Sequence, residues 1–442
     1  MLTYSFENID TESMYEHLYR CIKQDILQKK LRAGEKLPSK RTFAKNLGVS
    51  TITVESAYAQ LVAEGFLYTL PKRGYYVCEL EREEPVAPLP PRPKGPAPRE
   101  PDKRAYWADF VGSSVARDMF PFSVWAKHLR DVTAGEDEAT LLTDTSAGGI
   151  RQLRQAISDH LYQFRGMTID PEQIVVGAGT EYLYSVLIQL LGRQWGYAVE
   201  DPGYLRLSKI YEKNDVVTYH IPMDQAGIIP EKLEESGAEI LHITPSHHFP
   251  TGIVMPVSRR YEFLSWASKG ENRYIIEDDY DCEFRLAGRP IPTLQSIDVM
   301  EKVIYINTFS KSLAPAFRIS YLVLPKHLVT RFYETLGFYS GTVSCLEQMT
   351  LARFLSEGYF EKHINRMRNH YRALRDKLLL ALRQSPLAGR VKISEEHAGL
   401  HFLLELDTQR SDEERDKFAA AVLCGDHAAS AADLINLTHN LD

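Results

Sequence analysis

The chain has 442 residues, more than one compact core usually organises, so two or three domains are expected. Its hydrophobic content of 44% and charged content of 25% are ordinary for a globular protein, and no apolar run is long enough to span a bilayer. The N-terminus lacks the features of a signal peptide, and the five cysteines show no metal or disulfide spacing. These features predict a cytoplasmic protein without a membrane segment or a metal site.

The N-terminal region carries three predicted helices. Apolar residues recur at helical spacing over residues 12–30, at Met14, Leu18, Ile22 and Ile26. A second helix is expected to begin at Pro38 or Ser39 and to end at Gly48, because these residues favour helix starts and ends. Ser50 is the expected N-cap of a third helix over residues 50–63.

A short hairpin is predicted after the third helix. Phe66–Tyr68 and Tyr75–Val77 are rich in aromatic residues, which favour strands. The turn between them carries Lys72, Arg73 and Gly74. Three helices followed by a basic hairpin predict a winged helix-turn-helix.

Positive charge is concentrated in this region, although the whole chain has a net charge of −7. Residues 20–45 contain nine Lys or Arg against two Asp or Glu. Such a basic face can bind nucleic acid on a protein that is acidic overall, and the alternative is a solvated helix surface. The third helix is expected in the major groove of double-stranded DNA. The predicted DNA contacts are Lys40, Arg41, Ser50, Thr51, Thr53, Lys72, Arg73 and Gly74.

Composition changes sharply after the hairpin. Residues 81–104 contain eight prolines, mixed charges and few large apolar residues, which predicts a semi-rigid extended linker. The predicted domains are therefore a winged helix over 10–80, a linker over 81–105 and a third domain over 106–442.

From about residue 106, helical patterns alternate with short apolar strands, which favours a largely parallel α/β sheet covered on both faces. The expected strands include Ile174–Val176, Ile240–Ile243, Tyr274–Ile276, Val303–Ile306 and Ser320–Leu324. Ligands of such sheets bind beyond the carboxyl ends of the strands. Asp278, Lys311 and the Gly177–Thr180 turn fall at those ends.

Lys311 carries the strongest chemical signal. It follows a buried strand and precedes Arg318 by seven residues. Such a lysine can form a Schiff base with the aldehyde of pyridoxal 5'-phosphate (PLP), while the arginine pairs with the phosphate. A carboxylate one strand upstream, in Tyr274–Tyr280, can hold the pyridine nitrogen protonated. The alternative for Lys311 is an ordinary surface lysine. A PLP site joined to a DNA-binding module suggests a sensor.

Three motifs closely resemble the MocR subfamily of GntR-type bacterial transcription regulators, and the resemblance covers about residues 10–408. They are Thr244–Gly252 (TPSHHFPTG), Ile275–Asp281 (IIEDDYD) and Thr308–Ser312 (TFSKS). Members of this family join a winged helix to a PLP-binding domain of the fold type I aminotransferase class. The chain looks most similar to members that respond to γ-aminobutyrate.

The resemblance implies a role for each matching residue. The implied PLP ligands are Lys311, Asp278, Tyr280, Gly179, Thr180, Tyr204, Thr308 and Arg318. Asp278 would pair with the pyridine nitrogen, Tyr280 with the ring hydroxyl, and Tyr204 would stack on the ring. Arg206 would bind the carboxylate of an effector. The structural alternatives are a paired acid for Asp278, a core residue for Tyr204 and a surface residue for Arg206.

The family also implies a homodimer, in which the winged helix of one chain reaches the PLP domain of the other. A small amine or amino acid effector would displace Lys311 from the cofactor, forming an external aldimine, and would bias DNA binding without net turnover. One alternative is an active aminotransferase with a DNA-binding module, although Phe249 stands where aminotransferases commonly have asparagine. The other is a regulator that binds DNA without sensing.

The sequence departs from the family pattern after about residue 408. Residues 399–406 fit a strand of the small domain, but no later position matches the arginine that normally binds the effector carboxylate. A truncation or a frameshifted end would explain the difference. We expect PLP binding to survive, because the predicted PLP ligands all precede residue 320, and the effector response to be weakened or lost.

Overall fold

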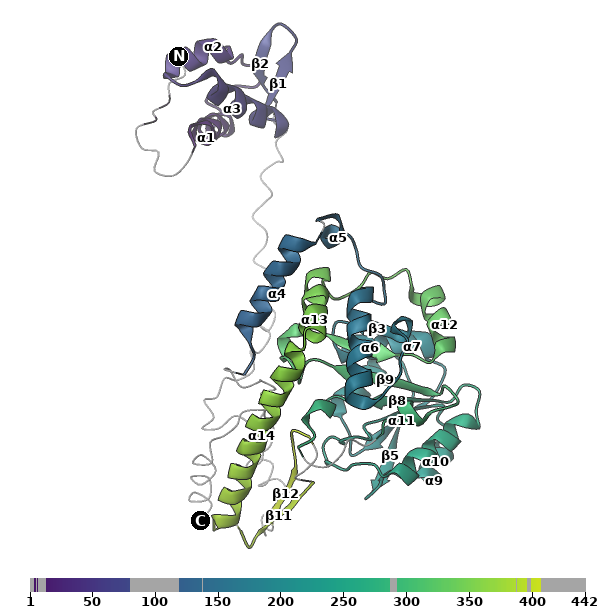
Figure 1. Cartoon of the computed structure of the whole chain (residues 1–442). Coiled ribbons are helices and arrows are strands. Elements are labelled where there is room, and N and C mark those ends of the chain that lie inside the picture. The colour runs from purple at the N-terminus through teal and green to yellow at the C-terminus, as the bar shows by residue number, and fades with distance from the viewer. Residues whose placement is uncertain are drawn as a thin grey trace, which may run out of the picture. The chain divides into compact units, whose positions relative to one another are not determined.

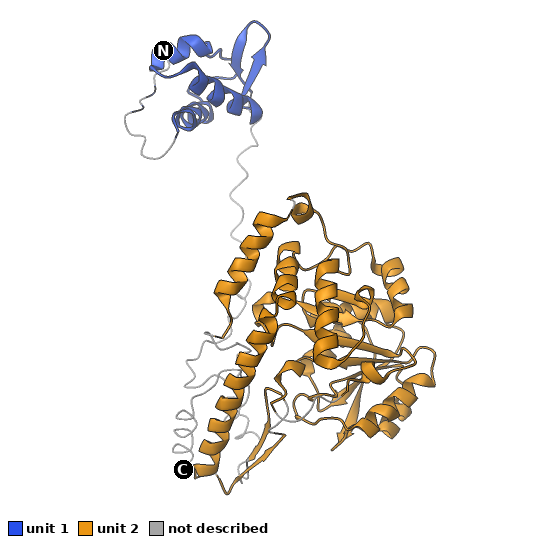
Figure 2. Ribbon diagram, in the orientation of Figure 1, with its two compact units in different colours: residues 1–103 blue, residues 104–442 orange. Residues whose placement is uncertain are grey.

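The computed structural model describes residues 4, 6, 13–79, 119–136, 138–286, 292–386, 388–395 and 399–406. The chain divides into two compact units, a smaller one within residues 1–103 and a larger one within residues 104–442 (Figure 2). None of the described helices combines the length and the apolar character that a bilayer crossing requires.

The described part of the smaller unit contains three helices and a two-stranded sheet (Figure 1). The helices are α1 (Met14–Leu27), α2 (Lys40–Leu47) and α3 (Thr51–Ala63). Strand β1 (Leu67–Leu70) pairs antiparallel with β2 (Gly74–Val77). This arrangement is the predicted winged helix-turn-helix.

Capping residues place the helix boundaries close to the predicted positions. The Ser39 hydroxyl accepts a hydrogen bond from the Thr42 amide at 3.2 Å, and the Ser50 hydroxyl accepts one from the Thr53 amide at 3.1 Å. Gly48 ends α2 with φ of 68°, a left-handed conformation that glycine adopts without strain.

The helices and the hairpin of the smaller unit share one hydrophobic core. Leu18, Ile22 and Leu61 are completely buried in it, and Leu67 joins them from the hairpin. Met14, the first of the apolar positions at helical spacing, lies in α1 but its side chain is 54% exposed. Met14 is the first residue of α1, and the buried stripe of the helix begins one turn later at Leu18.

In the described part of the larger unit, eight strands form one sheet in the order β3-β10-β9-β8-β7-β4-β5-β6. Their bounds are β3 (Ile174–Gly177), β4 (Tyr197–Asp201), β5 (Thr218–Asp224), β6 (Gly227–Ile228), β7 (Ile240–Ile243), β8 (Tyr274–Asp278), β9 (Val303–Thr308) and β10 (Ser320–Val323). Strands β5, β4, β7, β8 and β9 pair in parallel, whereas β10 runs antiparallel between β9 and β3. The predicted, largely parallel sheet is confirmed.

Helices surround this sheet, and a separate hairpin follows the last helix (Figure 1). The described helices are α4 (Phe122–Gly135), α5 (Glu138–Leu142), α6 (Arg151–Arg165), α7 (Thr180–Leu191), α8 (Leu205–Lys213), α9 (Pro230–Ser236), α10 (Val257–Ser268), α11 (Leu294–Ile297), α12 (Lys326–Leu336), α13 (Cys345–Ser356) and α14 (Tyr359–Gln384). The hairpin pairs β11 (Val391–Ser394) with β12 (Leu403–Leu406).

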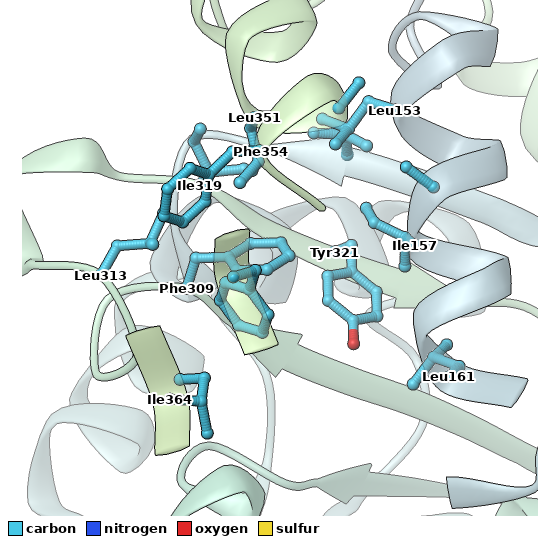
Figure 3. Close-up of a cluster of buried hydrophobic side chains, with 14 of the residues drawn as sticks. Leu153, Ile157, Leu161, Phe309, Leu313, Ile319, Tyr321, Leu351, Phe354 and Ile364 are labelled. Atoms are coloured by element: carbon cyan, nitrogen blue, oxygen red, sulfur yellow. The ribbon is translucent and has the colours of Figure 1, made fainter. Parts of the chain in front are cut away.

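Successive side chains of the strands face opposite sides of the sheet, so both faces are buried. Ile174 and Val176 belong to a cluster with α6, α13 and α14, whereas Val175 between them packs with α7 and α12. Figure 3 shows the first cluster, in which side chains of α6, α13 and α14 surround the aromatic rings of Phe309 and Tyr321. A third cluster packs α9 and α10 against the same face of the sheet as the first cluster, where it includes Ile275 and Val303.

A buried glutamate ties β4 to the segment that follows β7. The carboxyl of Glu200 accepts hydrogen bonds from the amide and the hydroxyl of Thr244, at 3.1 and 2.7 Å. His248 Nε2 lies 3.4 Å from the same carboxyl oxygen. Burial raises the pKa of Glu200 to about 8 and lowers the pKa of His248 to about 4, so both groups are mostly uncharged at neutral pH. The contact is therefore no ion pair.

We predict that Leu61→Ala lowers the local stability of the smaller unit by about 2–5 kcal/mol, because it leaves a cavity in the core. Ile52→Ala is the matched control, because Ile52 lies on the same helix but is 73% exposed. Its effect should stay within about 0.5 kcal/mol. Hydrogen exchange at the amides of α1 and α3 measures both variants. Equal effects would contradict the proposed core.

We predict that Glu200→Gln removes a loss of stability that the wild type shows as pH rises toward 8. Folded Glu200 keeps its proton up to about pH 8, whereas the unfolded carboxyl has its ordinary pKa of 4.5, so folding takes up a proton and stability falls as pH rises. Between about pH 6.5 and 8 the wild type should lose roughly 1–2 kcal/mol relative to the variant. His248 contributes little there, because it is largely uncharged in the folded state and loses its charge above pH 6.5 when unfolded. Urea unfolding of both proteins at pH 6.5 and at pH 8 measures the difference. An equal change in the free energy of unfolding of the wild type and the variant would contradict the prediction.

Candidate functional site

The sheet brings several of the predicted cofactor residues to one edge. Thr308, the last residue of β9, pairs with Ser320 of β10, and Ser320 pairs on its other side with Gly177 of β3. Asp278 ends the neighbouring strand β8. The Thr308 hydroxyl donates to Ser310 Oγ at 2.9 Å and accepts from Ser320 Oγ at 2.8 Å. These residues lie at the carboxyl ends of the parallel strands, which is where sheets of this kind commonly bind ligands.

The backbone around Lys311 is held firmly by its neighbours. Phe309 and Leu313, two residues to either side, are 2% and 0% exposed in the core that Figure 3 shows. The Phe309 amide donates to the Ile319 carbonyl at 2.9 Å, and the Leu313 amide donates to the Phe309 carbonyl at 2.8 Å. Lys311 itself is partly buried. The turn after β9 therefore presents Lys311 at the same edge as Asp278.

Asp278 is a buried carboxylate, only 6% exposed, with one oxygen satisfied and one not. The Tyr184 hydroxyl donates to Oδ2 at 2.6 Å, and His242 Nε2 lies 3.6 Å from the same oxygen. Tyr211 Oη lies 2.6 Å from the other ring nitrogen of His242 and holds the ring in place. The buried oxygen Oδ1 has no hydrogen-bond partner among the described residues. Because such an oxygen is costly to bury, the site suits a ligand that donates an N–H group.

Gly179, Thr180 and Arg318 meet at the N-terminus of α7. Gly179 has φ of 94°, and a Cβ atom there would lie 2.5 Å from a guanidinium nitrogen of Arg318. Only glycine lets the arginine approach the backbone so closely. The amide of Ala178 donates to Thr342 Oγ1 at 3.0 Å, which fixes the turn. A helix N-terminus beside an arginine is suited to bind an anion.

Arg206, the predicted effector ligand, is engaged by an acid of the chain itself. Its Nη1 lies 2.8 Å from Glu181 Oε1, and Arg318 Nη2 lies 3.3 Å from Glu181 Oε2. The three side chains are between 41% and 63% exposed. Glu181 is not among the residues predicted from the sequence, because a glutamate at a helix start does not reveal which arginines will reach it.

The two aromatic residues predicted to contact the ring have different surroundings. Tyr204 is 41% exposed and packs edge-on against Phe249, with ring centroids 6.0 Å apart. Tyr280 lies deeper, and burial raises the pKa of its hydroxyl well above the ordinary value. Its oxygen is 3.4 Å from His247 Nδ1, which in turn lies 2.7 Å from Asp281 Oδ2.

A cluster of three side chains near Tyr280 was not predicted from the sequence. His247, Asp281 and His401 offer possible metal-ligand atoms within 4.8 Å of one another. Gly399 lies directly against them, because a Cβ atom on it would be 2.0 Å from His247 Nδ1 and 2.4 Å from Asp281 Oδ2. The Leu400 amide also donates to Asp281 Oδ2 at 3.2 Å. This cluster therefore packs the segment before β12 against the main sheet.

In the smaller unit, the predicted basic contacts of the hairpin lie at its tip. Lys72 and Arg73 are exposed in the three-residue loop between β1 and β2. Gly74 follows with φ of 109°, which a residue with a side chain rarely adopts. The exposed lysine and arginine can reach DNA phosphates.

The predicted contacts on the helices are partly engaged within the protein. Lys40 pairs with Glu55 of α3 at 2.5 Å, and the hydroxyls of Ser50 and Thr53 are 2.8 Å apart. Arg41 and Thr51 are exposed. Ile52, which is not among the predicted contacts, is 73% exposed at the start of α3, where an apolar side chain can contact a thymine methyl group. Ile52 could have been found from the sequence, because it is an apolar residue outside the buried stripe of α3.

Comparison with known proteins identifies both units. The gntR family of bacterial regulatory proteins matches residues 14–77. The HTH-type transcriptional regulator YdeL of Bacillus subtilis is 39% identical over 393 residues, which cover 89% of this chain and 84% of that protein. The probable rhizopine catabolism regulatory protein MocR of Rhizobium meliloti is 32% identical over 416 residues, which cover 90% and 83%.

Solved aminotransferases share the fold of the larger unit. The multiple substrate aminotransferase of Thermococcus profundus has a TM-score of 0.63 at 24% identity, over 72% of this chain and 81% of that chain. The α-aminoadipate aminotransferase LysN of Thermus thermophilus, solved with N-(5'-phosphopyridoxyl)-L-leucine, has a TM-score of 0.60 at 20% identity, over 74% and 89%. The chain belongs to the MocR-type transcription regulators, in which a GntR-family winged helix that binds DNA is joined to an aminotransferase-like domain of fold type I.

Proposed function

We propose that this chain is a PLP-dependent transcription regulator that senses a small amine or amino acid. PLP, when bound, supplies an aldehyde that condenses with primary amines. The observation that carries the proposal is the buried Asp278 Oδ1, which lacks a hydrogen-bond donor among the described residues. It lies at the end of β8, Lys311 follows the paired strand β9, and the N-terminus of α7, which is suited to bind an anion, follows β3.

The residues at this edge fit the three polar parts of PLP. Asp278 Oδ1 would accept the N–H of the protonated pyridine ring. The amine of Lys311 would hold the aldehyde carbon until an effector amine replaces it. Arg318 and the backbone N–H groups of Gly179 and Thr180 would bind the phosphate, with the Thr308 hydroxyl next to them. Tyr280 and Tyr204 would contact the ring.

We propose γ-aminobutyrate, or an amino acid of similar length, as the effector. Arg206 is its local support, because a cation is needed for the carboxylate at the far end of such a molecule. Glu181 has to release Arg206 before this can happen. The sequence shows no match to the family arginine after residue 408, and that part of the chain lies outside the described residues. A weakened effector response therefore stays a prediction from the sequence.

We also propose a homodimer in which the winged helix of one protomer reaches the aminotransferase-like domain of its partner. Binding of an effector amine would change the contacts of Lys311 and bias DNA binding through domain orientation. Two alternative functions remain. An active aminotransferase would release a keto acid from an amino donor, and a regulator without sensing would bind DNA regardless of amines.

We predict that the purified chain with PLP shows a visible absorption band that Lys311→Ala abolishes, because the variant has no amine at this position to hold the aldehyde. Lys326→Ala, which removes an exposed lysine at the start of α12, should keep the band. An unchanged band in Lys311→Ala would contradict the assignment of Lys311.

Adding γ-aminobutyrate to the PLP-loaded protein then distinguishes the functions. A spectral shift without keto-acid product supports sensing, and a band that ignores every amine tested supports DNA binding without sensing. Accumulation of a keto acid from an amino donor would support the aminotransferase.

We predict that replacing Lys72 and Arg73 together by glutamine weakens binding to double-stranded DNA of any sequence. The logarithm of affinity should depend less steeply on the logarithm of salt concentration, by about 0.9 for each phosphate that the hairpin no longer neutralises. Fluorescence anisotropy with labelled DNA over a salt series measures the slope. Lys326→Gln is the charge control in the larger unit, and an unchanged slope in the double variant would exclude binding of phosphates by the hairpin.

A further inference from the structure

We propose that Glu181 is an internal anion that competes with the cofactor phosphate for Arg318 and with the effector carboxylate for Arg206. In this way one glutamate limits how tightly the site binds anionic ligands. The inference rests on the proposed function, because it requires a phosphate at the N-terminus of α7. It adds a residue that determines affinity and that takes no part in the chemistry of the aldehyde.

The geometry places Glu181 between two arginines from different elements. Arg206 lies on α8, and Arg318 lies in the segment between β9 and β10. Each arginine contacts a different oxygen of the same carboxylate, at 2.8 and 3.3 Å. Arg318 also lies over Gly179, where a Cβ atom would be 2.5 Å from its guanidinium. The carboxylate therefore holds the arginine that the phosphate needs, directly beside the predicted phosphate site.

The charges at this place favour competition. Glu181 is the second residue of α7, so its negative charge already benefits from the positive end of the helix dipole. Arg206 and Arg318 bring two positive charges, and Glu181 cancels one of them. A phosphate that binds the same helix end meets this carboxylate as a like charge. Glutamine at this position would leave both positive charges for the ligand and would keep the size of the side chain.

The exposure of the three side chains limits the effect and keeps it measurable. Ion pairs between side chains that are 41% to 63% exposed contribute little to folding, so a variant at this position should fold normally. The same screening means that the gain in ligand affinity is modest. We expect Glu181→Gln to bind PLP about two- to tenfold more tightly than the wild type at low salt. The difference should shrink as salt is added.

The first experiment is a titration of the full-length apoprotein with PLP, in which the Lys311-dependent visible band reports binding. Glu181→Gln is compared with the wild type and with Glu136→Gln. Glu136 is the matched control, because it pairs with Arg353 at 3.1 Å and its side chain is 34% exposed. Tighter binding in Glu181→Gln alone supports the proposal. Equal binding in that variant would mean that Glu181 does not compete, and weaker binding would mean that it orients the arginines for the ligand. Either result overturns the proposal.

The second experiment keeps this test separate from the proposed function. Inorganic phosphate is added to the Lys311→Ala variant and to the double variant that also carries Glu181→Gln. The rise in melting temperature of each protein reports binding of phosphate to the folded state. If the wild type gives no visible band with PLP, the proposed function fails, yet this experiment still decides the role of Glu181. A larger rise in the glutamine variant supports competition, and an equal or smaller rise overturns it.

Discussion

A carboxylate buried at the end of a parallel strand is the constraint on which the candidate site depends. Asp278 is 6% exposed, and one of its oxygens accepts a hydrogen bond from Tyr184. His242 lies near the same oxygen and is itself held by Tyr211. The other oxygen has no donor in the described part of the chain. Burying it is unfavourable unless a ligand supplies one. A cofactor with a protonated ring nitrogen would therefore stabilise the folded sheet as well as fill the site.

The edge of the sheet explains how residues far apart in the sequence come together. Parallel strands place their carboxyl ends on one side, so Asp278 and Thr308 become neighbours without any local sequence signal. The antiparallel strand β10 then returns Ser320 to the same row and leaves Arg318 just before it, beside Gly179. The same sheet thus sets the positions of Asp278 and of the helix N-terminus that we propose as the phosphate site.

The sheet and the winged helix could be predicted because their signals are local, whereas the roles of the cofactor residues stay predictions. Continuous apolar strands indicated burial on both faces, and Ser39 and Ser50 marked helix starts by their capping chemistry. Side-chain partners across elements could not be predicted. The pairing of Arg206 with Glu181, 25 residues away, depends on how α8 packs beside α7. The exposure of Met14 likewise depends on where the core ends along α1.

The most direct test of the proposed site is to determine which lysine holds PLP. Borohydride reduction of the PLP-loaded chain fixes the cofactor to the amine that binds it, and peptide mapping then locates the label. We predict that one PLP is recovered per chain and that it lies on the peptide containing Lys311. Label spread over exposed lysines, or no label at all, would show that this sheet edge is not a PLP site.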